Sequence, residues 1–362
     1  MTYLTNNRRV LLILLREALF GSAPDELPTE DVQWEELIEE AEEQAVVALI
    51  FQVLAERQTP LPKQTVLQTQ LLSLNIQHAN RQLQQELINL NKLLAKEGFE
   101  YLVVKGAVAG NNYPQPHLRC PGDIDFYCKP QHFNKVRDLI ASEWHVNYEG
   151  HPKGHHQSFT HNHIHYELHN RIGQFYQQRK NRQWQQLTDN SPHTAVSIEE
   201  NNIPTLPPTL HVFYLFLHLY NHLLIAGIGL KQVCDVAMML HSEKEQINRE
   251  ELCGLLSGFG LEKAFRACGH VLVAYLGLPP DEFPYTLSPT DQRYGERMLE
   301  AVFRHGSFGY HHRRYQNESI AHTIESAIIQ IRHLFTFMPL SYTHTLHWAL
   351  YALQTKLLKA KR

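Results

Sequence analysis

The chain has 362 residues, of which 43% are hydrophobic and 19% are charged, and its formal net charge at pH 7 is -4. This composition excludes a disordered or fibrous protein, and a chain without a basic excess is not expected to bind DNA. The length suits two or three domains. Five cysteines without CxxC spacing argue against a disulfide framework or a cysteine zinc site, and they fit the reducing cytoplasm.

Two apolar segments raise the question of targeting or membrane insertion. The run at residues 10–15 is too short for the apolar part of a secretory signal, because Arg16 and Glu17 interrupt it. Residues 203–230 lack Asp, Glu, Lys and Arg and are long enough to cross a bilayer, but they contain three histidines and three prolines. A buried helix is the better interpretation, and we expect neither a signal peptide nor a membrane span.

Both ends of the chain are predicted to be helical. Apolar residues recur at helical spacing over residues 34–53, and prolines at 60 and 62 end this helix. A second long helix carries a leucine stripe over residues 83–94 and ends at Gly98. The later part of the chain has further apolar helical patterns at residues 210–224, 230–240, 252–276, 320–337 and 346–358.

The middle of the chain has a different pattern. Short apolar runs at residues 101–104 and 124–128 predict two strands, with glycine and proline turns between them. Residues 133–140 predict a short helix, and the strict alternation of residues 159–169 predicts one further strand. The fold class is therefore predicted as α+β. It has a helical region, a small mixed sheet domain and a second helical region, at residues 1–97, 98–202 and 203–362.

The acidic pair of Asp123 and Asp125 is the sharpest chemical signal. In a strand these two side chains point to one face, while Ile124 and Phe126 point to the other. Two neighbouring carboxylates repel each other and lose hydration when buried, and a hard divalent cation offsets both costs. The alternative is an acidic pair at a strand end without a ligand.

Two flanking segments favour the ligand interpretation. Upstream, Lys105 and Gly106 follow a predicted strand, and such a turn lets backbone amides and a lysine approach phosphate. Downstream, Glu167 adds a third carboxylate on the polar face of a predicted strand, as a two-metal site requires. The alternatives are a solvated surface lysine and a solvated strand glutamate.

Together these segments resemble the nucleotidyltransferase superfamily of the polymerase β type. In detail, the chain is similar to uncharacterised bacterial nucleotidyltransferases that carry a Lys-Gly turn and an Arg-x-x-Gly-Asp-x-Asp motif. The matching residues here are Lys105–Gly106 and Arg119–Asp125, and the resemblance covers roughly residues 78–240. It implies a small mixed α/β catalytic domain that takes a nucleoside triphosphate as substrate.

The resemblance also implies roles for individual residues. Asp123 and Asp125 would hold two magnesium or manganese ions, and Glu167 would complete the site and help to take the proton of the nucleophile. The superfamily usually has Gly-Ser at the turn where this chain has Lys-Gly, so no serine hydroxyl is available for the triphosphate. We expect Lys105, with Arg119, to make that contact. The alternative for Arg119 is an ion pair that braces the turn.

The 24 histidines are clustered. The histidines that alternate over residues 161–169 are expected on one strand face, where they would form a polar wall of the cleft. The alternative is a zinc site, although this face is longer than one ion needs. His155 and His156 are the candidates for contact with substrate phosphate. His218 and His222 share one helix face, and they either line the cleft or are hydrogen-bonded core histidines.

We therefore predict a cytoplasmic, magnesium-dependent nucleotidyltransferase. It would move a nucleoside monophosphate from a nucleoside triphosphate to an unknown small-molecule or protein acceptor, with release of pyrophosphate. The first alternative is a histidine-rich metal-dependent phosphohydrolase. The second is a non-catalytic accessory protein of the same fold that binds a nucleotide or another ligand. The fold alone does not choose the acceptor.

Overall fold

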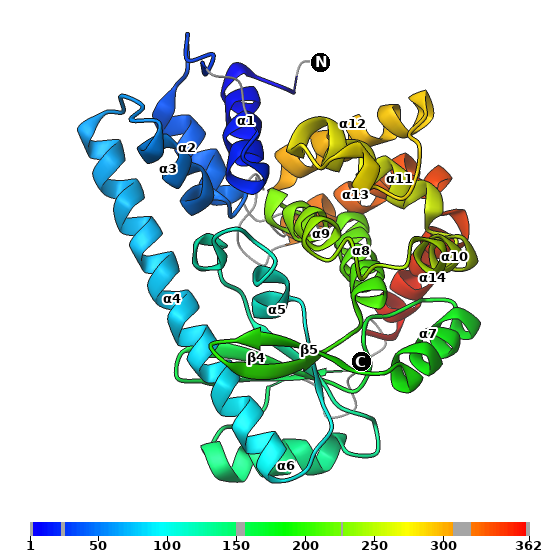
Figure 1. Ribbon diagram of the computed structural model, residues 1–362. Helices are drawn as coiled ribbons and strands as arrows, with labels where there is room; N and C mark the ends of the chain where they lie inside the picture. Colours follow the sequence, from blue (N-terminus) through cyan, green and yellow to red (C-terminus); the bar gives the residue numbers. More distant parts are fainter. Residues whose placement is uncertain (1–2, 23–25, 150–155, 226, 307–319, 360–362) are drawn as a thin grey trace.

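The computed structural model describes residues 3–22, 26–149, 156–225, 227–306 and 320–359 (Figure 1). Its first four helices are α1 (Asn6–Phe20), α2 (Trp34–Glu43), α3 (Val47–Glu56) and α4 (Lys63–Lys96). The single helix predicted at residues 34–53 is divided into α2 and α3, because Ala45 adopts a left-handed conformation with a φ of 57°. The apolar run at residues 10–15 lies mostly buried within α1.

The middle of the chain forms a four-stranded mixed sheet. Its strands are β1 (Leu102–Val104), β2 (Ile124–Tyr127), β3 (His156–His161) and β4 (Ile164–His169), in the spatial order β1-β2-β4-β3. The central pair, β2 and β4, is parallel, and both outer pairs are antiparallel. A separate hairpin consists of β5 (Thr194–Ile198) and β6 (Asn201–Thr205). The predicted α+β class and the strands predicted at residues 101–104 and 124–128 are confirmed.

The single strand predicted at residues 159–169 is wrong, because this segment is part of a hairpin. His161 ends β3, and Asn162 and His163 form a two-residue turn in which both have positive φ, of 46° and 66°. Such a turn matches the twist of antiparallel strands, and the sequence alternation runs through it without interruption. The alternating residues therefore do not share one strand face. Those that remain on β4 are His165, Glu167 and His169.

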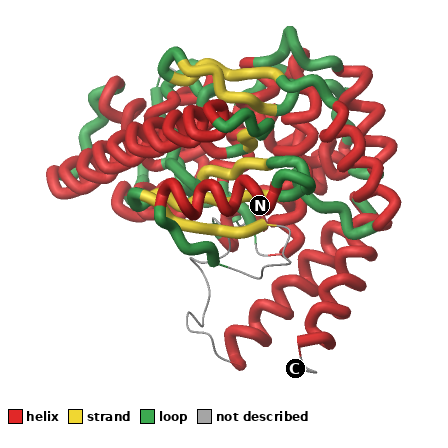
Figure 2. Tube along the Cα trace, turned by 90° about the horizontal axis from the view of Figure 1, so that it is seen from below, coloured by secondary structure: helices red, strands yellow, loops and turns green. Residues whose placement is uncertain are grey.

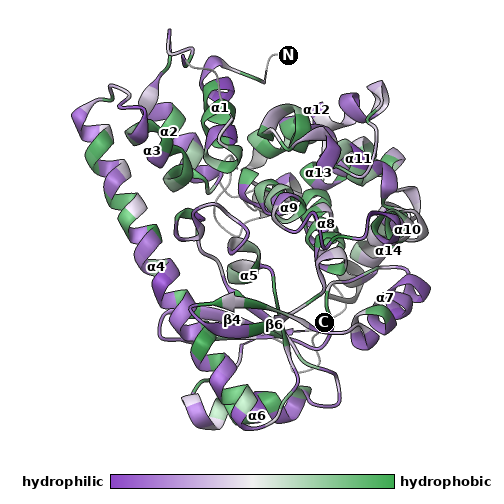
Figure 3. Cartoon of the chain, in the orientation of Figure 1, coloured by the Kyte–Doolittle hydropathy of each residue, from purple (hydrophilic) through white to green (hydrophobic). Residues whose placement is uncertain are grey.

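Helices cover both faces of the sheet. Figure 1 shows α6 (Phe133–Trp144) below the sheet and α5 (Gly106–Gly110), α8 (Pro208–Ile225) and α9 (Leu230–Ser242) above it. The second half of α4 packs with α6 on the lower face, around Phe126 and Tyr166. Hydrophobic and hydrophilic stretches alternate along α4 (Figure 3), as expected for a helix that covers a core with one face.

The upper face of the sheet meets the larger hydrophobic core. Apolar residues of α1, α2 and α3 and of the C-terminal helices belong to this one core, so both ends of the chain contribute to it. Its central helix, α8, is almost entirely buried. Among the described residues, no helix is both long and apolar enough to cross a membrane.

The remaining helices complete the C-terminal part. They are α7 (Gln178–Asn190), α10 (Arg249–Phe259), α11 (Glu262–His270), α12 (Pro289–His305), α13 (Ile320–Phe337) and α14 (Tyr342–Lys359). The helical patterns predicted at residues 210–224, 230–240, 320–337 and 346–358 are confirmed, and α12 is an additional helix. The pattern predicted at residues 252–276 is divided, because Gly260 adopts a left-handed conformation with a φ of 71° and ends α10. Figure 2 shows α13 and α14 side by side at one edge of the molecule. Short 3-10 or π-helical turns lie at Pro116–Leu118, Val271–Leu276, Pro280–Glu282 and Met338–Leu340.

Glu86 of α4 fixes the β3–β4 hairpin on the lower face of the sheet. Its side chain is buried, with a carboxylate that accepts hydrogen bonds from the Tyr166 hydroxyl at 2.9 Å and the Asn162 amide at 3.0 Å. The same carboxylate lies 2.6 Å from Nδ1 of His161. One helix side chain therefore holds both strands and their turn.

Replacement of this carboxylate should destabilise the hairpin. In Glu86→Ala the buried Tyr166 hydroxyl loses its acceptor, which should lower the free energy of unfolding by about 1–3 kcal/mol in urea titrations. Gln85→Ala, at the adjacent exposed position, is the matched control and should change stability little. An equally small loss for both variants would contradict this role of Glu86.

Candidate active site

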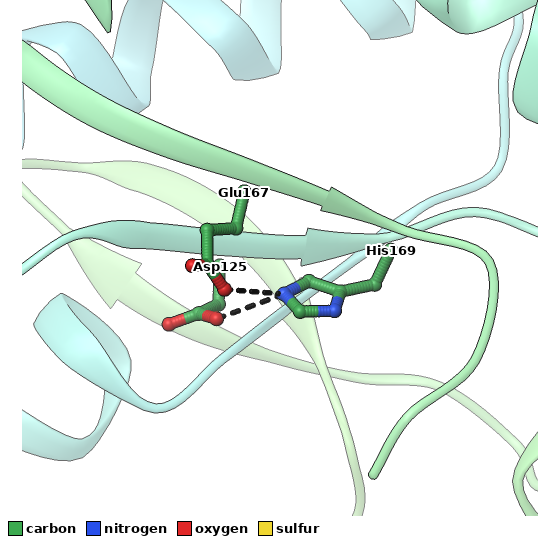
Figure 4. Close-up of side chains that lie close together, drawn as sticks. All are labelled: Asp125, Glu167 and His169. Carbon is green, nitrogen blue, oxygen red and sulfur yellow. Dashed lines mark hydrogen bonds and ion pairs between the residues drawn. The ribbon is translucent and has the colours of Figure 1, made fainter. Parts of the chain in front are cut away.

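Strand register brings the acidic side chains together. On β2, Asp125 lies opposite Val104 of β1 and opposite Glu167 of β4. Because side chains alternate along a strand, Asp125, Glu167 and His169 share the upper face, while Phe126 and Leu168 enter the lower core. Figure 4 shows the two carboxylates and the imidazole directed toward one another.

The carboxylate of Asp125 is the centre of the cluster and only 1% exposed. Its Oδ1 accepts a hydrogen bond from Nζ of Lys105 at 2.7 Å and lies 2.9 Å from Nε2 of His169. Its Oδ2 is buried and has no hydrogen-bond partner among the residues that the structure describes. Since a buried oxygen without a partner is unfavourable, this atom indicates a place where a cation would be stabilised.

Two cations keep these carboxylates ionised. Burial alone would raise the pKa of Asp125, but the Lys105 ammonium and the His169 hydrogen bond hold that pKa below its ordinary value. Burial also opposes the ionisation of Glu167, but His169, with Nε2 3.1 Å from Oε2, lowers the pKa of Glu167 to about 2. A carboxylate with so low a pKa is a weak proton acceptor at neutral pH, so its charge suits a cation better than a proton.

Asp123 lies one residue before β2 and is the least compensated acid of the site. It forms no ion pair within the described chain, and burial, followed by the charge of Asp125, raises its pKa. The potential ligand atoms that lie within 4.8 Å of one another belong to Asp125, Glu167 and His169. This set differs from the predicted metal ligands by His169 in place of Asp123. Its oxygen-rich chemistry, and the unpartnered Oδ2 of Asp125, fit a hard divalent cation.

The turn after β1 holds Lys105 in a backbone conformation that few residues other than glycine adopt. Its φ is 59° and its ψ is -150°, a region that costs on the order of 1–3 kcal/mol for a residue with a side chain. Gly106 follows, and a Cβ at Gly106 would lie 2.7 Å from the carbonyl oxygen of Asp123. The Lys105 side chain is 14% exposed and paired with Asp125, so the alternative of a solvated surface lysine is wrong.

An ion pair braces the segment that precedes the acids. Arg119 donates from Nε and Nη2 to the two carboxylate oxygens of Asp235 in α9, at 2.7 and 2.8 Å, and the Tyr113 hydroxyl donates to the same carboxylate at 2.8 Å. The Arg119 carbonyl accepts a hydrogen bond from Asn80 of α4 at 2.7 Å. The structure thus contains the bracing pair that the sequence left as an alternative. The contact of Arg119 with a triphosphate stays a prediction.

Two cavities lie beside the acids, between the sheet and α8, and the smaller one also reaches α9. Both are lined by Lys105, Glu167, His218 and His222. The smaller cavity, of about 170 Å³, is also lined by Gly122, Asp123, Asp125, Lys231 and Gln232. The larger cavity, of about 390 Å³, is also lined by His156, Arg171, Gln174, Tyr176 and Tyr214.

Two histidines of α8, His218 and His222, belong to the walls of these cavities. The rings of His218 and His222 lie 4.3 Å apart, and burial, followed by the charge of Lys105, lowers the pKa of His222 to about 4 and that of His218 well below its ordinary value. Of the two interpretations for this pair, the structure favours the cleft lining. His156 lines the larger cavity, whereas His155 lies outside the described residues.

Lys231 is a site residue that the sequence did not predict, as is His169 among the candidate metal ligands. Lys231 lies in the first turn of α9 and lines the smaller cavity. A signal was present, since Lys231 is the first charged residue after the uncharged segment 203–230, and Asp235 follows it by one helical turn. Without a match to the family motif, it appeared to be an ordinary helix residue.

The pairing of Arg119 with Asp235 can be tested by stability. Asp235→Ala leaves a buried guanidinium unpaired, which should lower the free energy of unfolding by about 3–5 kcal/mol in urea titrations. The double variant Arg119→Met with Asp235→Leu removes both charges and should recover most of that loss. A loss below about 1 kcal/mol in Asp235→Ala would show that the pair does not brace the site.

The low pKa of Glu167 predicts a specific acid sensitivity. The pKa of Glu167 is lower in the folded than in the unfolded protein. Ionised Glu167 therefore stabilises the fold fully above the pKa of the unfolded state, and this stabilisation is lost as the pH falls toward the pKa of the folded state. Between about pH 5 and about pH 3, the wild type should lose roughly 2 kcal/mol more stability than Glu167→Gln. Glu149→Gln, which changes a carboxylate outside the cluster, is the control. Parallel pH profiles for wild type and Glu167→Gln would contradict the assigned shift.

The chain is similar to known nucleotidyltransferases in sequence and to one solved structure. The sequence model of a family described as uncharacterised nucleotidyltransferases matches residues 30–277, which include the sheet, the three acids, α8 and α9. One solved structure, an antigenic nucleotidyltransferase-like protein from Paracoccidioides brasiliensis, is 13% identical, with a TM-score of 0.33 over 56% of this chain and 92% of that chain. No curated protein matches the chain. Because the family match covers more than half of its length, this chain belongs to the family of uncharacterised nucleotidyltransferases.

Proposed function

We propose that the protein is a metal-dependent nucleotidyltransferase that moves a nucleoside monophosphate from a nucleoside triphosphate to an acceptor. The observation that carries the proposal is the cluster of buried carboxylates on β2 and β4 beside two cavities, in a chain of a nucleotidyltransferase family. The acceptor would be a small molecule or a protein side chain. All five cysteines are free, which supports a place in the reducing cytoplasm.

Asp123, Asp125 and Glu167 would hold the cation, magnesium or manganese. Bound there, it would supply positive charge next to the phosphate oxygens. Without ligand, Lys105 and His169 neutralise the same carboxylates, at 2.7 and 2.9 Å from Oδ1 of Asp125. Lys105 lines both cavities, so its ammonium would be available to phosphate if the charge of Asp125 were neutralised by a bound cation.

The proposed reaction is a displacement at the α-phosphorus of the nucleotide. An acceptor oxygen forms a new bond to this phosphorus, and the bond to the oxygen that bridges the α- and β-phosphates breaks. The electron pair of that bond leaves with pyrophosphate, and the proton of the acceptor hydroxyl passes to solvent. His218 and His222, which are neutral at pH 7, add hydrogen-bonding groups to the cavity wall without adding charge.

The phosphohydrolase alternative has less support. It requires several histidine ligands, but the candidate metal set contains His169 as its single histidine among the described residues. Of the other hairpin histidines, His161 pairs with Glu86 on the lower face of the sheet, and His156 lines the larger cavity without belonging to the candidate metal set. The retained carboxylates likewise give the accessory-protein alternative less support.

A thermal-shift experiment tests metal and nucleotide together. Each nucleoside triphosphate should raise the melting temperature in the presence of magnesium or manganese but not with excess chelator, because carboxylate and phosphate oxygens repel each other unless a cation lies between them. Ligand at 100 times its dissociation constant should add about 2.7 kcal/mol of stability. Equal stabilisation with chelator would overturn the metal requirement, and no stabilisation by any nucleotide would overturn nucleotide binding.

Asp123→Asn is the appropriate variant for this experiment. Asp125 is paired with Lys105, so its replacement also breaks a buried ion pair, whereas Asp123 forms no ion pair within the described chain. We expect Asp123→Asn to retain the melting temperature of the ligand-free protein and to lose the metal-linked shift. Asp138→Asn, on the exposed surface of α6, is the control and should behave as wild type.

A further inference from the structure

Lys231 places an ammonium group in the smaller cavity, directly above the acidic segment. This ammonium lies close to Gly122, since a Cβ at that position would be 3.8 Å from Nζ of Lys231. The ammonium makes no hydrogen bond or ion pair within the part of the chain that the structure describes. Burial, followed by the charge of Arg119, lowers the pKa of Lys231, so an anion in this cavity would stabilise its charged form.

The other two strong cations of this cavity are already paired. Lys105 binds Asp125 at 2.7 Å, and Arg119 binds Asp235 through two hydrogen bonds. Lys231 therefore has its charge available for a ligand without breaking an ion pair. Of the three, it is the residue best suited to bind an anion in the protein as it stands.

The position of Lys231 is fixed by the N-terminal helices. Gln44, at the end of α2, is fully buried, and its side-chain oxygen accepts a hydrogen bond from the backbone amide of Leu230 at 3.0 Å. The carbonyl of Gln44 accepts from the amide of Lys231 at 3.3 Å, and its side-chain amide donates to the carbonyl of Val302. The first turn of α9 is thus held at the cavity by residues distant in sequence.

The dimensions of the two cavities indicate which part of a ligand each one takes. About 170 Å³ is below the roughly 300–1,000 Å³ of a complete small-molecule site, so the smaller cavity suits part of a ligand. The larger cavity, of about 390 Å³, falls within that range and has the tyrosine rings of Tyr176 and Tyr214 in its wall. A compact, highly charged group fits the smaller cavity, and a sugar or base fits the larger one.

We propose that Lys231 forms a polyphosphate subsite, which binds the β- and γ-phosphates of the nucleoside triphosphate in the smaller cavity. This inference rests on the proposed function and adds a residue to it. In this proposal Lys105 and Lys231 have different roles. Lys105 balances Asp125 until a cation binds, while Lys231 is ready for the phosphates from the start.

Lys231→Met tests the subsite, because methionine keeps most of the apolar stem and removes the charge. Titration calorimetry with magnesium would compare each nucleoside triphosphate with its monophosphate. The triphosphate should bind about 10- to 150-fold more weakly to the variant, whereas monophosphate binding should change little. Lys231→Arg should keep most of the affinity, and Lys135→Met, an exposed lysine of α6, should behave as wild type. Melting temperatures would establish that the variants are folded.

Inorganic pyrophosphate with magnesium separates failure of this inference from failure of the proposed function. If wild type binds triphosphates and Lys231→Met binds them equally well, or loses monophosphate to the same extent, the subsite is overturned and the function stands. If wild type binds pyrophosphate in a Lys231-dependent manner but no nucleotide, the subsite stands and the nucleotidyltransferase proposal fails. Binding of neither ligand to the wild type overturns both.

Discussion

The buried carboxylate of Asp125 is the constraint on which the other features of the site depend. An ionised group that is 1% exposed must be compensated, and Lys105 and His169 provide this from β1 and β4. To reach it, Lys105 adopts a strained backbone conformation, and Gly106 allows the turn to pack against Asp123. The parallel register of β2 and β4 is required as well, because it places Glu167 and His169 on the same face as Asp125.

Two further buried polar contacts join the sheet to the helices around it. The pair of Arg119 and Asp235 connects the acidic loop to α9, and Gln44 connects the end of α2 to the first turn of α9. Both contacts are buried, where an unpaired polar group would be costly. The site therefore lies where three segments distant in sequence meet. Their relative positions are set by directional hydrogen bonds as well as by apolar packing.

The sequence predicted β1 and β2, the shared face of Asp125 and Glu167 and the α+β class, because these follow from side-chain periodicity and local turns. It did not predict the β3–β4 hairpin, since alternation continued through Asn162 and His163 and only their positive φ reveals the turn. It also did not predict the break between α2 and α3 at Ala45, because the apolar spacing continues through a residue whose φ is positive. The pairing of Arg119 with Asp235 and the placement of Lys231 depend on tertiary contacts more than 100 residues apart along the chain, which no local pattern encodes.

The charges of the site link the binding of a cation to the binding of a triphosphate in the proposed function. The three carboxylates of Asp123, Asp125 and Glu167 lie close to the side chains of Lys105, Lys231 and His169, which offset part of their charge. A divalent cation bound there would add positive charge and so strengthen the attraction of the site for a triphosphate. In the proposed function, cation and triphosphate would therefore strengthen each other's binding, and this coupling would be reciprocal. Because a cation would have to compete with Lys105 and His169 for Asp125, the nucleotide would supply part of the stabilisation that holds it.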